Sequence, residues 1–133
     1  MLKKMELSYI IKTKIYFLLF LNLLKVIYIL KFKNFDYLIK FLKSISIKKN
    51  KLQIDERSIF DREKKLSKLL KINKCLIKSA CLYKTLRDLG FRADLLIGIK
   101  KDNIFSSHAW VEGNDKNLID EKNKLFKEII KFS

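Results

Sequence analysis

The chain has 133 residues, of which 49% are hydrophobic, so it predicts a packed protein with one modest core and excludes two separate cores. The formal charge of +16 ordinarily indicates nucleic acid or an anionic membrane surface as a partner. Lysine, isoleucine, leucine, phenylalanine and asparagine are abundant, proline is absent and glycine occurs three times, which is typical of an A/T-rich codon bias. We therefore interpret the charge as a solvated lysine coat and predict no nucleic-acid partner; an acidic lipid surface or partner is the alternative.

The first predicted element is a long apolar helix. Residues 15–30 read IYFLLFLNLLKVIYIL, with Asn22 and Lys25 as the only strongly polar members. At 100° per residue, polar side chains fall on one arc about 100° wide, namely Lys14, Asn22, Lys25, Lys33, Asp36, Lys40 and Lys43. A spanning helix needs ~20 apolar residues, and a central lysine is costly in a bilayer, so spanning is disfavoured. We expect the apolar face to pack into the core, with a membrane surface or a partner protein as the alternative.

The chain divides by character into an apolar and basic helical region, residues 1–54, and a following core region, residues 55–133, which together form one compact domain. Residues 44–54 predict a loop. Asp55 is the expected N-cap of a helix through about Lys71, and Asn73 is the expected cap of a second helix over 74–89 that ends at a left-handed Gly90. The expected apolar face of the first of these helices comprises Ile59, Phe60, Leu66, Leu69 and Leu70. The expected buried side of the second comprises Leu76, Ala80, Leu82, Tyr83 and Leu86.

After Gly90 the pattern changes from helical to extended. Strands are predicted over 93–100, 105–112 and 116–120, with turns over 100–103 and 113–115. The last segment, LFKEIIKF, predicts a short helix that packs Leu125, Phe126, Ile129 and Ile130. Helices followed by a small antiparallel sheet give an α+β fold.

Three residues of this framework have the chemistry of a thiol hydrolase. Cys75 opens a helix, where unpaired backbone N–H groups and the positive end of the helix dipole favour the thiolate and can hold an oxyanion. His108, the only histidine, lies on a strand, and Asp120 follows after a turn. We predict Cys75 as nucleophile, His108 as general base and later acid, and Asp120 as the residue that orients the imidazole.

The predicted hairpin gives this triad a register. If residues 113–115 form a three-residue loop, Glu112 pairs with Lys116. The two residue numbers of every cross-strand pair then add up to 228. Because 108 and 120 also sum to 228, His108 lies opposite Asp120 on one face of the sheet, with Cβ atoms ~5 Å apart. A shift of one residue in the register would separate them.

Residues near the triad are predicted to line the site. Trp110 and Glu112 share strand parity with His108, and Ser79 lies one turn after Cys75, so we predict these three as substrate-binding residues. Cys81 is interpreted as a small core residue. A zinc site built from Cys75, Cys81, His108 and Asp120 is disfavoured because the C-x5-C spacing is not a usual metal clamp. Glycine-rich phosphate loops, paired metal carboxylates and nucleotide fingerprints are absent from the sequence, so we predict no metal and no cofactor.

Cysteine usage and the N-terminal segment bear on localisation. The two cysteines lie too close together for a disulfide framework, which favours a reduced compartment. A signal peptide is not expected, because no small-residue cleavage site follows the apolar segment. We therefore predict a cytoplasmic protein, with association with the membrane as an open alternative.

The triad segments also resemble a known family. Residues 75–100 read CLIKSACLYKTLRDLGFRADLLIGIK and residues 108–112 read HAWVE, with Asp120 downstream. The arrangement is similar to the transglutaminase-like leader peptidases of lasso-peptide biosynthesis, in which CLxRSLALYxLLRRxGxxAxLxIGV precedes HAWVE and an aspartate. The resemblance covers about residues 55–120. In this chain Lys78 replaces the usual arginine, Cys81 replaces a leucine, and residues 113–115 rearrange the turn glycine.

The resemblance implies a papain/transglutaminase-type fold and a cysteine protease that removes the leader from a ribosomally made precursor peptide, with Cys75, His108 and Asp120 as its triad. The implied partners are the precursor peptide, a separate leader-recognition protein, since the chain is too short to contain that domain, and a macrolactam synthetase. The apolar N-terminal helices and the basic surface are candidate docking sites for the recognition protein.

Two other functions stay open. One keeps the triad and changes the substrate, giving a general transglutaminase-like peptidase or amidase. The other is a basic membrane-associated binding protein with a degenerate site, against which the three intact triad residues argue.

Overall fold

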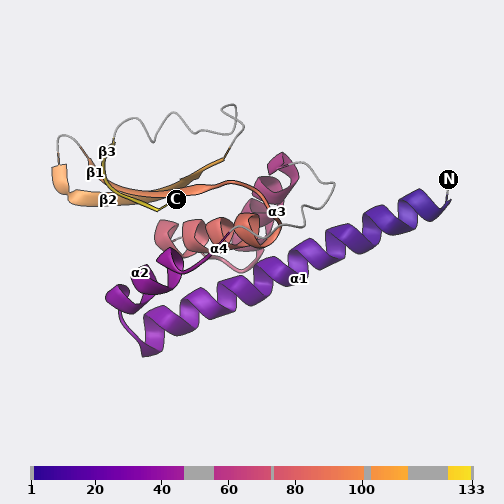
Figure 1. Ribbon diagram of the computed structural model, residues 1–133, viewed down its shortest axis with the longest axis horizontal. Coiled ribbons are helices and arrows are strands. Elements are labelled where there is room, and N and C mark those ends of the chain that lie inside the picture. Colours follow the sequence, from indigo (N-terminus) through magenta and orange to yellow (C-terminus); the bar gives the residue numbers. More distant parts are fainter. Residues whose placement is uncertain (1, 47–55, 73, 101–102, 114–125, 133) are drawn as a thin grey trace.

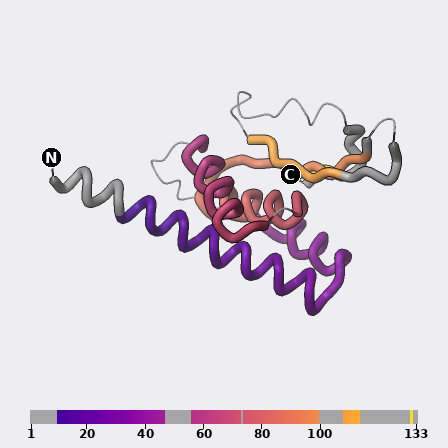
Figure 2. The backbone as a smooth tube through the Cα atoms, turned by 180° about the vertical axis from the view of Figure 1, so that it is seen from behind, coloured from indigo at the N-terminus to yellow at the C-terminus, as the bar shows by residue number. Residues whose placement is uncertain are grey.

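The computed structural model describes residues 2–46, 56–72, 74–100, 103–113 and 126–132. Its elements form three layers, with α1 and α2 on one side, α3 and α4 in the middle, and a three-stranded sheet on the other side (Figure 1). The view from behind shows the same order of layers (Figure 2). Helices that precede an antiparallel sheet confirm the predicted α+β class.

The N-terminal region forms two helices, α1 (Leu2–Phe32) and α2 (Phe35–Lys43). The chain turns between them because Asn34 caps α2, with its side-chain oxygen accepting a hydrogen bond of 2.8 Å from the backbone N–H of Tyr37. The predicted polar arc therefore extends over two helices rather than along one axis.

One face of α1 packs into the core against α3 and α4. Its buried residues follow the helical repeat and comprise Ile15, Leu19, Leu23, Val26 and Ile29. They belong to one hydrophobic cluster that also contains residues of α2, α3, α4, β1 and β2. The expectation of core packing is therefore correct for this face of α1.

Asn22 departs from the predicted polar edge, because it is buried on the core face with 3% of its surface exposed. Its amide nitrogen donates hydrogen bonds to Thr85 Oγ1 at 2.8 Å and to Asp88 Oδ2 at 3.3 Å. Thr85 in turn donates to the Cys81 carbonyl at 2.8 Å. Asn22 is therefore a polar link between α1 and α4. The prediction that it belongs to a polar arc apart from the core-packing face is wrong.

The middle layer contains α3 (Glu56–Leu69) and α4 (Cys75–Asp88). The predicted apolar face of α3 is correct for Ile59 and Phe60, which are buried, and wrong at its C-terminal end, where Leu69 is 77% exposed and Leu70 is also exposed. The face is rotated because α3 buries Glu63 and Ser67 instead. Asp55 lies outside the described residues.

The bounds and buried side of α4 follow the prediction closely. Ala80, Leu82, Tyr83 and Leu86 are buried, while Leu76 is half-buried. Gly90 has a φ of 87°, the predicted left-handed conformation. The N-cap residue is Lys74, which makes no side-chain capping bond, in place of the predicted Asn73, which lies outside the described residues.

The sheet has the order β2-β1-β3 and is antiparallel throughout its described strands, β1 (Asp94–Lys100), β2 (Asn103–Glu112) and β3 (Phe126–Phe132). The predicted C-terminal helix is wrong, since that segment is β3. A helix of eight residues is marginal on its own, whereas pairing with β1 satisfies the backbone groups of both strands. The predicted strand over 116–120 lies outside the described residues.

The link between α1 and α4 predicts the cost of removing Asn22. We expect Asn22→Ala to lower the free energy of unfolding by about 1–3 kcal/mol, because a buried and a part-buried hydrogen bond are lost. Lys25→Ala is the matched control: Lys25 is the other polar residue of the segment but is exposed, so its loss should cost about 0.5 kcal/mol or less. Urea denaturation measures both, and equal losses in the two variants would contradict the assignment of Asn22.

Candidate active site

A cavity of about 430 Å³ opens between α3, the start of α4 and β2. Its lining combines apolar side chains with the nucleophilic, basic and acidic groups needed for hydrolytic chemistry, comprising Phe60, Glu63, Lys64, Ser67, Lys68, Ile72, Cys75, Lys78, Ser79, Leu82, His108, Ala109, Trp110 and Val111. The structure thus brings Cys75 and Ser79 of α4 together with His108 and Trp110 of β2 at one cavity.

Cys75 occupies the first residue of α4 and is half-buried with a free thiol. Because the Lys74 side chain makes no capping bond, it does not compete for the N–H groups of the first turn. These groups are donors for an oxyanion formed next to the sulfur. The start of α4 therefore places a free thiol next to backbone donors of the kind that stabilise an oxyanion.

His108 lies on β2 and shares its face with Trp110, as the strand parity predicted. The two rings stack with centroids 5.6 Å apart and planes inclined by 16°. The residue opposite His108 on β1 is Gly98, so no side chain from that position competes for space beside the imidazole. Trp110 is buried and donates its indole N–H to Glu112 Oε1 at 3.2 Å.

Ser79 connects the helix of Cys75 to the strand of His108. Its hydroxyl donates a buried hydrogen bond of 2.9 Å to the carbonyl of Ala109, the residue after His108. This contact fixes the position of β2 relative to the first turns of α4. Ser79 therefore has a positioning contact in addition to lining the cavity.

The remaining predicted site residues lie elsewhere. Glu112 is not among the residues that line the cavity. It is linked to the cavity only indirectly, because it accepts a hydrogen bond from the lining residue Trp110. Asp120 and the hairpin register that would place it opposite His108 lie outside the described residues. The roles of all six residues stay predictions.

Cys81 points away from the cavity and is a core residue, as predicted. Its thiol donates to the carbonyl of Leu19 on α1 at 3.2 Å. Burial, reinforced by the negative charge of Glu63, raises the pKa of Cys81 to about 12. Because the sulfur contacts α1, Cys81 cannot join Cys75 in the zinc site considered above. Within the described ranges, no group of three or more histidine, cysteine or acidic side chains could hold a metal ion.

Sequence reasoning missed the polar residues that α3 contributes. Glu63 is buried in the cavity wall and accepts a hydrogen bond of 2.5 Å from Ser67 Oγ, one turn along the helix. Burial raises the pKa of Glu63, while the Ser67 hydrogen bond and the charges of Lys78 and Lys64 oppose that rise. The helical spacing of Phe60, Glu63 and Ser67 places them on one face of α3, but the sequence does not indicate that this polar face is the buried one.

The two cysteines should differ sharply in reactivity. We expect iodoacetamide to alkylate Cys75 of the folded protein and Cys81 at least about 100-fold more slowly, because the Cys81 thiol is buried and remains protonated. Peptide mass spectrometry after timed quenching measures the two rates, and unfolding in denaturant should abolish the difference. Comparable rates in the folded protein would contradict the placement of Cys81.

Glu63 should make stability depend on pH. Because its pKa is raised in the folded state, the folded chain holds this proton more tightly than the unfolded chain, and the resulting stabilisation is lost as the pH rises above the ordinary value of 4.5. Glu63→Gln should therefore raise the Tm relative to wild type more at about pH 8 than at about pH 4. Asp61→Asn, which removes an exposed carboxylate from the same helix, is the control. A constant difference in Tm across this range would contradict the proposed burial of the charge.

Comparison with known proteins assigns the cavity to a family. A family model for the transglutaminase-like superfamily matches residues 53–131, more than half of the chain, and this range includes α3, α4 and all of the described sheet except Phe132. Searches of curated proteins and of solved structures gave no match. The superfamily includes cysteine peptidases and transglutaminases. By its sequence over the cavity-forming region, the chain belongs to the transglutaminase-like superfamily.

Proposed function

We propose that this protein is a cysteine endopeptidase that removes the leader from a ribosomally synthesised lasso-peptide precursor. The observation that carries the proposal is the meeting of Cys75, at the first residue of α4, and His108, on β2, in one cavity. Membership of the transglutaminase-like superfamily supports acyl chemistry at a cysteine. The similarity of residues 75–100 and 108–112 to the leader peptidases supports the choice of substrate.

The chemistry proceeds in two halves. In the first, His108 takes the thiol proton of Cys75, and the sulfur attacks the carbonyl carbon of the scissile peptide bond. The N–H groups of the first turn of α4 hold the oxyanion, and His108 returns the proton to the leaving nitrogen as the C–N bond breaks. The product of this half is a thioester on Cys75 and a free amine on the core peptide.

In the second half, water hydrolyses the thioester. His108 removes a proton from the attacking water, the C–S bond breaks, and the proton passes to the Cys75 sulfur, which restores the enzyme. Asp120 is assigned to hold His108 in one tautomer. Ser79 and Trp110 are assigned to the cavity wall that contacts the peptide, and Glu112 orients Trp110 through the indole hydrogen bond.

The partners follow from the substrate. We infer that a separate leader-recognition protein presents the precursor peptide, and that a macrolactam synthetase uses the amine that cleavage releases. The balance of the reaction needs only water in addition to the peptide, so the proposed cleavage involves no cofactor.

The central test is cleavage of the precursor peptide in the presence of the recognition protein. Cys75→Ala should lower the rate by roughly 1000-fold or more, because the nucleophile is lost. His108→Ala should have an effect of similar size, and Asp120→Asn should lower the rate by roughly 100-fold or more through the wrong tautomer of His108. Mass spectrometry of the released core peptide measures the rates.

Cys81→Ala is the matched control, because it removes the other thiol from the same helix without touching the cavity and should retain most of the activity. Cleavage that survives Cys75→Ala would end the nucleophile assignment. Hydrolysis of simple amides without cleavage of the precursor would instead support the general amidase function.

A further inference from the structure

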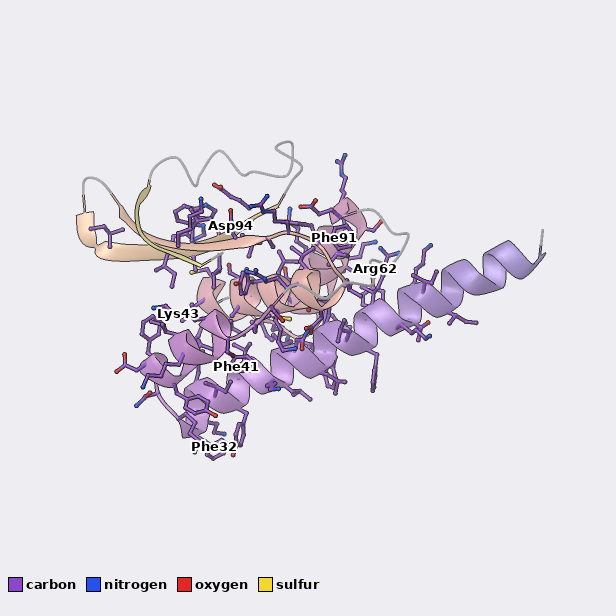
Figure 3. The ribbon with its side chains drawn as sticks, in the orientation of Figure 1. Phe32, Phe41, Lys43, Arg62, Phe91 and Asp94 are labelled. Atoms are coloured by element: carbon purple, nitrogen blue, oxygen red, sulfur yellow. The ribbon has the colours of Figure 1, made fainter. Side chains whose placement is uncertain are left out.

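The side of α1 that faces away from the protein carries a second apolar surface, here called the outer strip. Its members are each 39–64% exposed and comprise Ile10, Phe17, Phe20, Leu21, Leu24, Tyr28 and Phe32. At 100° per residue they fall within an arc of about 120°, opposite the core face. From Ile10 to Phe32 the outer strip is about 33 Å long. Phe32 is directed away from α4 and the sheet (Figure 3).

The outer strip is apolar surface beyond what the fold uses. Large contiguous apolar patches on a soluble protein mark sites of interaction, because leaving them in water is unfavourable. The segment Ile10–Phe32 has a mean hydropathy of 1.9 over its most apolar window and is long enough to cross a membrane, although core helices of soluble proteins meet the same criteria. The question is therefore which surface covers the strip.

The charge around the outer strip is of one sign. Between Glu6 and Asp36 the sequence contains the lysines 12, 14, 25, 31 and 33 and no carboxylate. These lysines are exposed, and Lys31 lies over the Phe32 ring with its nitrogen 5.7 Å from the ring centroid. Aromatic and aliphatic side chains bordered by lysines match the boundary between acyl chains and anionic headgroups. This arrangement favours an anionic lipid surface over a protein surface.

The core face of α1 decides how the helix can meet a bilayer. Leu19 accepts a bond from Cys81, and Asn22 donates to Thr85, both on α4. A helix that crossed the membrane would leave α4 and abandon these contacts, together with the core packing of its buried residues. A helix that lies in the plane of the interface keeps them, because only the outer strip enters the lipid.

We propose that the outer strip of α1 seats the protein on an anionic lipid bilayer, with α1 parallel to the surface. The residues that line the cavity come from α3, α4, β2 and Ile72, and none comes from α1, so the cavity stays accessible in the bound protein. The lysine coat adds electrostatic attraction to the headgroups. Lipid binding is thus independent of the peptidase chemistry.

Flotation of the full chain with vesicles tests the proposal. Vesicles of phosphatidylglycerol and phosphatidylcholine should bind the protein at least about tenfold more strongly than phosphatidylcholine alone, and high salt should weaken binding. The double variant F17E/L24E should lower the affinity by about tenfold or more, because two charges would have to enter the lipid. Leu69→Glu, which places the same charge on an exposed leucine of α3, should change it less than about twofold.

Folding of the variants is checked by circular dichroism and by protection of Cys81 from alkylation. Phe32→Glu, at the end of the helix, provides a second variant if the double substitution disturbs α1. Equal binding of wild type and folded strip variants would overturn the proposal, as would failure of wild type to bind anionic vesicles.

Two further outcomes would assign the outer strip to another occupant. A wild-type dimer in sedimentation velocity that F17E/L24E dissociates, without vesicle binding, would make the strip a contact between copies of the chain. Capture of the leader-recognition protein that the strip variants abolish, again without vesicle binding, would make it a protein-docking surface. Resistance of bound protein to alkaline carbonate extraction would overturn the parallel orientation. Precursor cleavage by wild type and the strip variants is measured separately in solution, without vesicles. This assay tests the proposed peptidase function, so its failure is distinguishable from failure of lipid binding.

Discussion

The packing of α4 between α1 and the sheet is the constraint on which the rest of the structure depends. On one side, Cys81 and Thr85 make polar contacts with Leu19 and Asn22 of α1. On the other side, Ser79 donates to the carbonyl of Ala109 on β2. A helix buried on both sides has little freedom to rotate or slide, because either movement would leave buried polar groups without partners. Its first residue, Cys75, is therefore held in a defined position relative to β2.

This rigidity has a direct consequence for the cavity. A nucleophile and a base from separate elements are useful only if their distance is maintained, and the Ser79 contact lies within one turn of Cys75 and one residue of His108. In addition to α4 and β2, the helix α3 forms a wall of the cavity. Its Glu63 and Ser67 line the cavity together with Lys78 of α4. The cavity thus combines a buried carboxylate with half-buried and exposed basic groups at the junction of three elements. Its chemistry depends on tertiary packing more than on any one motif.

The two faces of α1 divide structural and interaction roles along one helix. The core face contributes Ile15, Leu19 and Leu23 to the hydrophobic cluster, whereas no residue of the outer strip belongs to that cluster. A helix that is apolar all round produces no strong amphipathic signal, so its orientation cannot be read from periodicity. Asn22 shows this clearly, since one of the two strongly polar residues of the segment faces the interior. Burial became favourable there because α4 offers hydrogen-bond partners.

Local signals were sufficient for α4, Gly90, β1 and β2, because apolar periodicity, a left-handed glycine and β-branched runs act over a few residues. The predicted roles of Cys75 and His108 also rest on local features, because a cysteine at a helix start and a histidine on a strand each have a definite chemistry, and the structure places both at one cavity. Tertiary structure alone decided the rest. The C-terminal segment became β3 because β1 presented an unpaired edge, and α3 buries Glu63 rather than Leu69 in its packing against α1 and α4. Such choices depend on partners far away in the chain, whose positions no local pattern contains.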